Sequence, residues 1–81
     1  MIWTMIERLV RMTYDPDADA AYIYVTDPIG RGEAASGVVL DHHFDSASVN
    51  VDLDDQNRLL GIELLGVSRL LRPEALPQAD V

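Results

Sequence analysis

The chain has 81 residues, of which 48% are hydrophobic and 25% charged, and it carries a formal net charge of −8 at pH 7. A chain of this length builds one small domain with a thin core, and its lack of cysteine excludes disulfides, thiolate metal sites and a cysteine nucleophile. Ten side chains between Met12 and Asn57 are acidic and only Arg31 is basic, which disfavours nucleic-acid binding. The simpler interpretation of this charge is solubility, and a basic partner protein is the alternative. No apolar run reaches the ~18–20 residues of a bilayer span, so we expect a cytoplasmic protein without a membrane partner.

Residues 1–11 are expected to form an N-terminal extension of the domain. Apolar side chains recur there at the i, i+3, i+4, i+7 spacing of a helix, at Ile2, Met5, Ile6 and Leu9. The segment lacks an N-cap residue in front of this pattern. We predict a short helix in it, then a single β-rich domain over residues 12–72, and a C-terminal tail with a helical turn over residues 73–81.

Two strands are predicted on either side of an aspartate-rich turn. Residues 11–14 and 20–26 are rich in β-branched and aromatic side chains, which favour extended structure. Between them, Pro16 suits the second position of a type I turn, and Asp15 can accept a hydrogen bond from the backbone two residues on. A loop with Pro28 and two glycines ends the second strand.

Three further strands are predicted, over residues 36–44, 49–53 and 59–65. A tight loop joins the last two. Beyond Gly66 the apolar pattern changes and indicates one or two helical turns. Ser68 is the candidate N-cap of the first turn, and Pro73 suits the first position of the second.

The register of the last hairpin follows from its side-chain pattern. We set Val51 opposite Leu60 and Val49 opposite Ile62, because a slip by one residue would mix apolar and acidic side chains on one face. This register predicts one apolar face, which consists of Val49, Val51, Leu53, Leu60, Ile62 and Leu64. The loop then requires a left-handed residue, and Asn57 is expected to supply it.

Together these elements predict a mainly β (α+β) fold: a small antiparallel β-meander of about five strands with short N- and C-terminal helical segments. In the second strand, Ile23 and Val25 lie on one side and Tyr22 and Tyr24 on the other, so both faces have apolar character. A small sheet with two such faces covers the second one with a helix or another subunit. We therefore expect a homodimer whose interface includes Tyr22, Tyr24 and Leu59.

Two aspartate-rich stretches partly match a calcium-binding loop. The first supplies D-x-D-x-D with Asp15, Asp17 and Asp19, but alanine and threonine stand where glycine and glutamate are needed. The second consists of Asp52, Asp54, Gln56 and Glu63. Its Glu63 lies on a predicted strand, from which it cannot turn back toward the loop. We interpret both as turns, and weak cation binding stays an open alternative.

Other candidate sites are weaker still. In the stretch 41–45, Asp41, His43 and Asp45 would share one face of a strand while His42 points away, and a solvated strand edge is the simpler interpretation. The glycine-rich segment 30–35 lacks the preceding strand and following helix of a dinucleotide site. No serine lies in a nucleophile-elbow context. We expect no catalytic residue, no cofactor and no metal, and hence a protein that is not an enzyme.

Two sequence blocks resemble those of a known family. They read Y-D-x-x-x-D-x-x-Y and D-x-D-x-x-N-x-x-x-G-I-E, followed by a serine. The matching positions are Tyr14, Asp15, Asp19, Tyr22, Asp52, Asp54, Asn57, Gly61, Ile62, Glu63 and Ser68. The pattern is similar to that of the small prokaryotic family catalogued as domain of unknown function 2283, over about residues 12–72, with Asn57 in place of the usual glycine.

This resemblance implies a small, mostly β, bacterial domain of unknown function. Some members of the family look like one half of two-gene modules whose other product resembles a small toxin. A first hypothesis is therefore a non-enzymatic interaction domain that acts as the antitoxin-like partner of a small basic toxin. The alternative is a self-associating structural β-domain without a dedicated partner, and a weak metal-binding module is the third.

Overall fold

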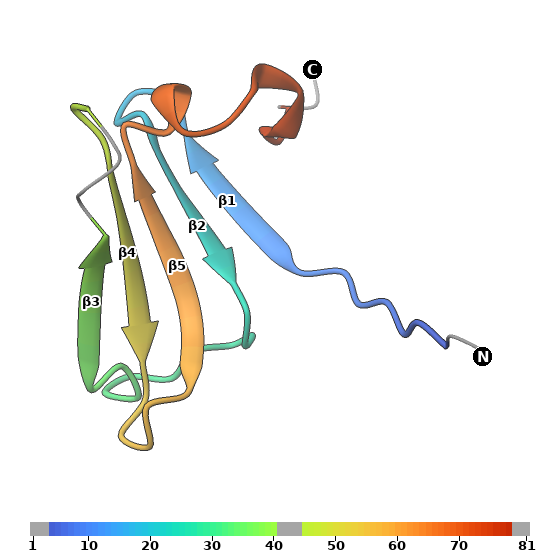
Figure 1. Cartoon of the computed structure of the whole chain (residues 1–81), viewed down its shortest axis with the longest axis vertical. Coiled ribbons are helices and arrows are strands. Elements are labelled where there is room, and N and C mark those ends of the chain that lie inside the picture. The colour runs from blue at the N-terminus through green and yellow to red at the C-terminus, as the bar shows by residue number, and fades with distance from the viewer. Residues whose placement is uncertain (1–3, 41–44, 79–81) are drawn as a thin grey trace.

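The structure, a computed structural model, describes residues 4–40 and 45–78. Five strands form one open antiparallel sheet in the order β1-β2-β5-β4-β3 (Figure 1). These strands are β1 (Arg11–Asp15), β2 (Ala20–Tyr24), β3 (Ser36–Leu40), β4 (Ser48–Leu53) and β5 (Leu59–Leu65). The mainly β fold and its antiparallel sheet are thus confirmed. Within the described ranges, no helix is long and apolar enough to cross a membrane.

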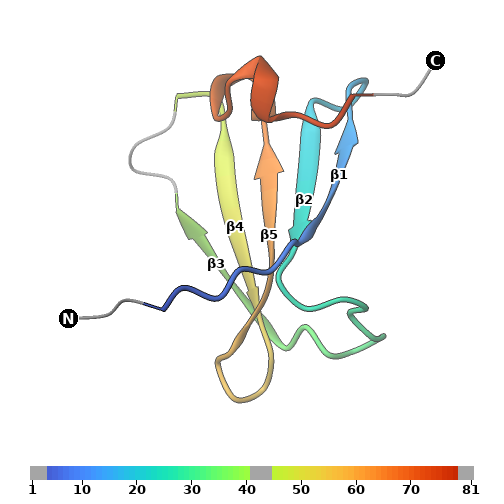
Figure 2. The same cartoon turned by 90° about the vertical axis from the view of Figure 1, so that its right-hand side faces the viewer.

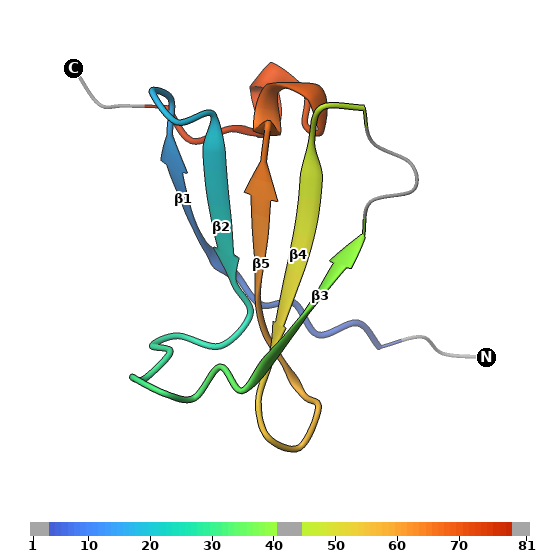
Figure 3. The same cartoon turned by 90° about the vertical axis from the view of Figure 1, so that its left-hand side faces the viewer.

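Strand β5 occupies the centre of the sheet, between β2 and β4. The chain first makes the β1–β2 hairpin and then crosses to the far edge through the loop 25–35, which passes one end of the sheet (Figure 3). It returns through β3 and β4 to β5, which pairs with β2. Two separate hairpin systems are therefore joined along β5, which contains two of the four apolar side chains with the least exposure, Leu60 and Leu64.

The pairing of β4 with β5 differs from the predicted register by two residues. Val51 lies opposite Ile62 and not Leu60, and Val49 lies opposite Leu64. Because side chains alternate along a strand, a shift by two leaves the paired residues 49–51 and 62–64 on their predicted faces. The apolar face is therefore as predicted, although the individual partners are not.

Two separate shifts of one residue produce this difference. The hairpin closes with Leu53 opposite Leu59 instead of Arg58, and a β-bulge between Asp52 and Leu53 adds the second shift. The loop is held by two backbone hydrogen bonds, in which the Asp54 N–H donates to the Arg58 carbonyl over 2.9 Å and the Asn57 N–H to the Asp54 carbonyl over 3.1 Å. Asn57 has φ of 60°, which confirms the left-handed conformation.

The predicted N-terminal helix is wrong for residues 4–10, which form neither helix nor strand. We call this segment the arm. It runs away from the sheet beyond β1 (Figure 1). A helix of this length is not stable by itself in water, and the arm has neither an N-cap nor a surface against which its apolar side chains pack.

The chain ends in two short 3₁₀ turns, η1 (Val67–Arg69) and η2 (Pro73–Ala75), and the described residues contain no α-helix. Gly66, with φ of 72°, precedes η1 as its N-cap residue, so the N-cap role predicted for Ser68 is wrong. Pro73 opens η2 as predicted. The third predicted strand is confirmed up to Leu40, and its remainder, residues 41–44, lies outside the described residues.

The two faces of the sheet differ sharply in chemistry. On one, which we call the apolar face, every strand residue is uncharged; it consists of Met12, Tyr14, Ala21, Ile23, Ser36, Val38, Leu40, Val49, Val51, Leu53, Leu60, Ile62 and Leu64. The C-terminal turns pack on one end of this face, where Val67 joins Ala21 and Leu64 in the core (Figure 2). The opposite face carries Tyr22 and Tyr24 with several acidic side chains, and we call it the tyrosine face.

Candidate binding face

Tyr22 and Asp52 contact each other across the central strand. Tyr22 in β2 donates a hydrogen bond of 2.6 Å from its hydroxyl to the Asp52 carboxylate in β4. The ring lies over Gly61 of β5, where a Cβ atom would overlap with it. Burial, and then the hydrogen bond to Asp52, raise the pKa of Tyr22 well above its ordinary value. Tyr22 is therefore a neutral hydrogen-bond donor at neutral pH.

Tyr24, two residues further along β2, extends this aromatic surface. Its ring centroid lies 4.8 Å from that of Tyr22, at an interplanar angle of 60°. The Arg11 guanidinium lies 3.7 Å from the Tyr24 ring centroid, in a cation–π contact, and it also donates to Asp27 over 2.9 Å. This hydrogen bond lowers the pKa of the Asp27 carboxyl. The one basic strand residue on this face is thus engaged within the chain.

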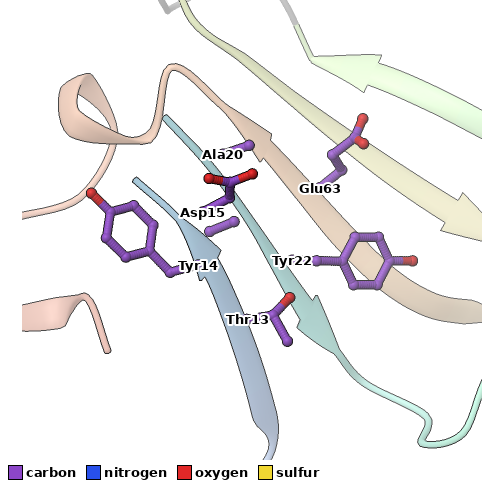
Figure 4. A pocket seen from close by; sticks show the side chains of 7 residues that line it. Thr13, Tyr14, Asp15, Ala20, Tyr22 and Glu63 are labelled. Atoms are coloured by element: carbon purple, nitrogen blue, oxygen red, sulfur yellow. The ribbon is translucent and has the colours of Figure 1, made fainter. Parts of the chain in front are cut away.

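Glu63 lies on the central strand β5, directly opposite Tyr22 of the neighbouring strand β2. Its carboxylate accepts a hydrogen bond of 2.7 Å from the side-chain amide of Asn50. Next to it lies a pocket of about 240 Å³, which is lined by Thr13, Tyr14, Asp15, Ala20, Ala21, Tyr22 and Glu63. Figure 4 shows Tyr22 and Glu63 on one side of this sheet region, with Tyr14 pointing away from them.

The first aspartate-rich stretch divides into two structural roles. Asp15 accepts hydrogen bonds from the N–H groups of Asp17 and Ala18, over 3.0 and 3.3 Å, and so stabilises the turn after β1. Asp19 has φ of 50°, and its carboxylate accepts from the backbone N–H and the hydroxyl of Ser68, over 3.0 and 2.7 Å. The turn assignment is confirmed for Asp15, whereas the sequence did not predict the contact of Asp19 with Ser68.

The acidic side chains of the second aspartate-rich stretch also have separate hydrogen-bond partners. Asp54 accepts from the N–H groups of Gln56 and Arg58 and pairs with the Arg58 guanidinium over 2.9 Å. These contacts, led by the Arg58 N–H, lower the pKa of Asp54. Asp52 and Glu63 instead contact Tyr22 and Asn50. Among residues 4–40 and 45–78, no three His, Asp or Glu side chains lie where they could share a metal ion.

The other candidate sites named from the sequence do not form a site among the described residues. Asp41, His42 and His43 lie outside the described residues, so the structure does not test a site there. The glycine-rich segment 30–35 is followed by strand β3 and not by a helix, as expected for a chance match. Of the residues predicted at an interface, Tyr22 and Tyr24 are half-buried neighbours, and Leu59 is exposed at the start of β5.

The two sequence blocks of the family pattern thus consist mostly of residues that hold the sheet together. Tyr14 and Ile62 pack against the core, Asp15, Asp54 and Asn57 shape turns, and Gly61 makes room for Tyr22. A family model described as "Protein of unknown function (DUF2283)" matches residues 11–68. Neither the curated proteins nor the solved structures give a match.

Proposed function

The chain belongs to the DUF2283 family of proteins of unknown function, and we propose that it is a non-enzymatic interaction domain whose tyrosine face binds a basic segment of a partner protein. One observation carries this proposal. On that face, the Tyr22 ring and the Glu63 and Asp15 carboxylates border one pocket of about 240 Å³.

The shape and chemistry of the pocket suit a cationic side chain. The small side chain of Ala20 leaves room in it, while Glu63 and Asp15 supply negative charge from two different strands. An arginine or lysine that enters there can form charge-assisted hydrogen bonds with a carboxylate and lie against an aromatic ring. The hydrogen bond from Asn50 holds Glu63 in place, so little side-chain entropy is lost on binding.

The charge of the surroundings supports the same class of partner. A net charge of −8 attracts a cationic protein over a distance of about 8–10 Å at moderate salt. The Arg11 cation at the edge of the face is paired with Asp27, which leaves the Glu63 side of the face acidic. A small basic toxin is a partner of this kind, and an antitoxin-like role is the specific form of the proposal.

The experiment is a titration of fluorescein-labelled hexa-arginine with the protein, followed by fluorescence anisotropy at several salt concentrations. Glu63→Gln should weaken binding by about fivefold or more, because it removes the charge of the pocket. Glu74→Gln is the matched control, since it removes the same charge from an exposed position in η2. Equal effects of the two variants would mean that the peptide senses net charge alone and would contradict the proposal.

A second experiment concerns the neighbouring genes. If a neighbouring short reading frame encodes a basic protein, the two products should co-purify as a stoichiometric complex, and Glu63→Arg should disrupt it. A complex that tolerates this reversal of charge would place the partner elsewhere. A self-associating structural domain is the second candidate function, and the apolar face is the observation that favours it.

A further inference from the structure

The apolar face is covered only at one end. The C-terminal turns place Leu70, Leu71 and Leu76 against the core near Ala21 and Leu64. At the far edge of the sheet, Val38 and Leu40 are 47% and 48% exposed. A contiguous apolar surface on one side of a small sheet requires a second layer, and the described residues of one chain supply only part of it.

The arm, in contrast, carries apolar side chains that are exposed and pack against no part of the described chain. Met5, Ile6 and Leu9 are 88%, 93% and 97% exposed. The arm projects from the β1 edge on the side of the sheet where the C-terminal turns lie, and those turns pack on the apolar face (Figures 1 and 2). An open apolar surface and an unpacked apolar segment thus lie on the same side of the molecule.

The exposed surface area of the chain exceeds that of a compact monomer by more than one side of a subunit interface. The chain exposes 6697 Å², whereas a compact monomer of 9.0 kDa exposes about 4,900 Å². Its radius of gyration is 14.6 Å, against about 12 Å for a compact chain of 81 residues. The excess of about 1,800 Å² per chain is larger than the ~800 Å² per partner that a stable interface of ordinary size buries.

We propose that the apolar face is the interface of a homodimer, in which the arm of each copy lies across the apolar face of the other. An arm of seven residues reaches about 23 Å when extended, and a sheet of five strands is about 19 Å wide. The arm can therefore cross the whole face. This interface lies on the side of the sheet opposite to Tyr22 and Tyr24, and so leaves the tyrosine face free for a basic partner.

The local sequence favours the partner's face over the chain's own. Folding back would require a reversal of the chain close to Arg11, which is anchored on Asp27 and the Tyr24 ring. Residues 4–12 contain no glycine, proline, asparagine or aspartate, the residues that form tight turns. The arm therefore stands out in front of the apolar face without packing on it (Figures 1 and 2), where a second copy can receive it.

Electrostatics allows this arrangement. Two chains of −8 repel each other, but no strand residue of the apolar face is charged, and the two charged side chains of the arm, Glu7 and Arg8, have opposite signs. Added salt should strengthen the dimer, because it screens the repulsion between the acidic surfaces outside the interface.

Sedimentation equilibrium of Val38→Asp and Val39→Asp tests the face. The two residues are neighbours on β3, are 47% and 58% exposed, and lie on opposite sides of the sheet. Wild type should have twice the mass of 9.0 kDa. Val38→Asp should raise the dimer dissociation constant by about tenfold or more, and Val39→Asp by less than about twofold. A wild-type mass of 9.0 kDa at all concentrations, or equal effects of the two variants, would overturn the proposal.

The arm is tested separately by Ile6→Ser/Leu9→Ser, a variant that removes apolar side chains without touching the sheet. It should weaken the dimer as Val38→Asp does. A spin label on Glu7→Cys in unlabelled chains, mixed with ¹⁵N-labelled wild type, should broaden the amide signals of Val38 and Val51. Broadening that occurs only when label and isotope are in the same chain would show the arm on its own sheet and reject the exchange.

Discussion

The Tyr22 hydroxyl donates a hydrogen bond of 2.6 Å to Asp52, a residue 30 positions away on a strand that does not pair with its own. The contact exists because Gly61 on the intervening strand has no side chain, which leaves room for the Tyr22 ring above it. It joins the β1–β2 hairpin to the β3–β4–β5 meander on the tyrosine face, as the packing of Ile23 against Ile62 does on the other. Three residues of the family pattern thus act as one unit.

Gly61→Ala should destabilise the protein by about 1–3 kcal/mol, because the added methyl group displaces the Tyr22 ring and breaks its hydrogen bond. Gly37→Ala is the matched control on β3 and the same face, since a Cβ there meets its nearest atom at 3.5 Å. It should leave the free energy of unfolding within about 1 kcal/mol of wild type. Urea denaturation measures both, and similar losses would contradict the role of Gly61.

Tyr22→Phe should cost about 0.5–1.5 kcal/mol at pH 7, through loss of the hydrogen bond to Asp52. The difference between variant and wild type should shrink above pH 10. The pKa of Tyr22 is raised in the folded state, so its stabilisation is complete below the unfolded-state value near 10 and declines as pH rises beyond it. Denaturation at pH 7 and at several values above 10 checks this. A difference that grows with pH would refute the assigned direction.

Asn57→Gly should stabilise the protein by about 0.5–1 kcal/mol, because φ of 60° is strained for a residue with a side chain. The denaturant midpoint should rise at unchanged slope. A lower midpoint would contradict the left-handed assignment. At a residue with negative φ, glycine only raises the conformational entropy of the unfolded chain and so destabilises the fold.

Asp19→Gly should have the opposite effect, although Asp19 also has positive φ. Its carboxylate accepts two hydrogen bonds from Ser68, and their loss should outweigh the relief of strain by about 0.5–1.5 kcal/mol. Combining Asp19→Gly with Ser68→Ala should cost less than the sum of the single changes. Additive effects would show that the two side chains do not act together.

Asp15→Ala should cost about 0.5–1 kcal/mol, because Asp15 accepts hydrogen bonds within the turn, whereas Asp17→Ala should cost little. Thermal denaturation with and without millimolar calcium measures both effects. Calcium should leave the melting temperature of wild type unchanged. A rise that Asp17→Ala abolishes would revive the cation-binding interpretation of this stretch.

Local chemistry explains most of what the sequence predicts correctly. Residues near one another in the chain determine the Asp15 turn, the left-handed Asn57 and the first position of Pro73 in η2, so these can be predicted without knowing the sheet. The faces of β4 and β5 follow from alternation, which survives the shift of two residues caused by the longer loop and the bulge at Leu53.

Contacts between distant segments could not be predicted in this way. The sequence pattern assigns Tyr22 and Asp52 to strands but does not reveal that β2 and β4 flank β5, and their contact depends on that order. The same holds for Asp19 with Ser68. The helical spacing in the arm was misleading, because periodicity shows which side chains could share a surface and not whether one is available.

The central claim, that the two faces of the sheet serve different partners, is tested most directly by an NMR titration of ¹⁵N-labelled wild type with hexa-arginine. The amides of Thr13, Ala20 and Glu63 around the pocket should shift progressively, while those of Val38 and Val51 on the apolar face should not. Shifts confined to Val38 and Val51, or spread evenly over both faces, would contradict the account.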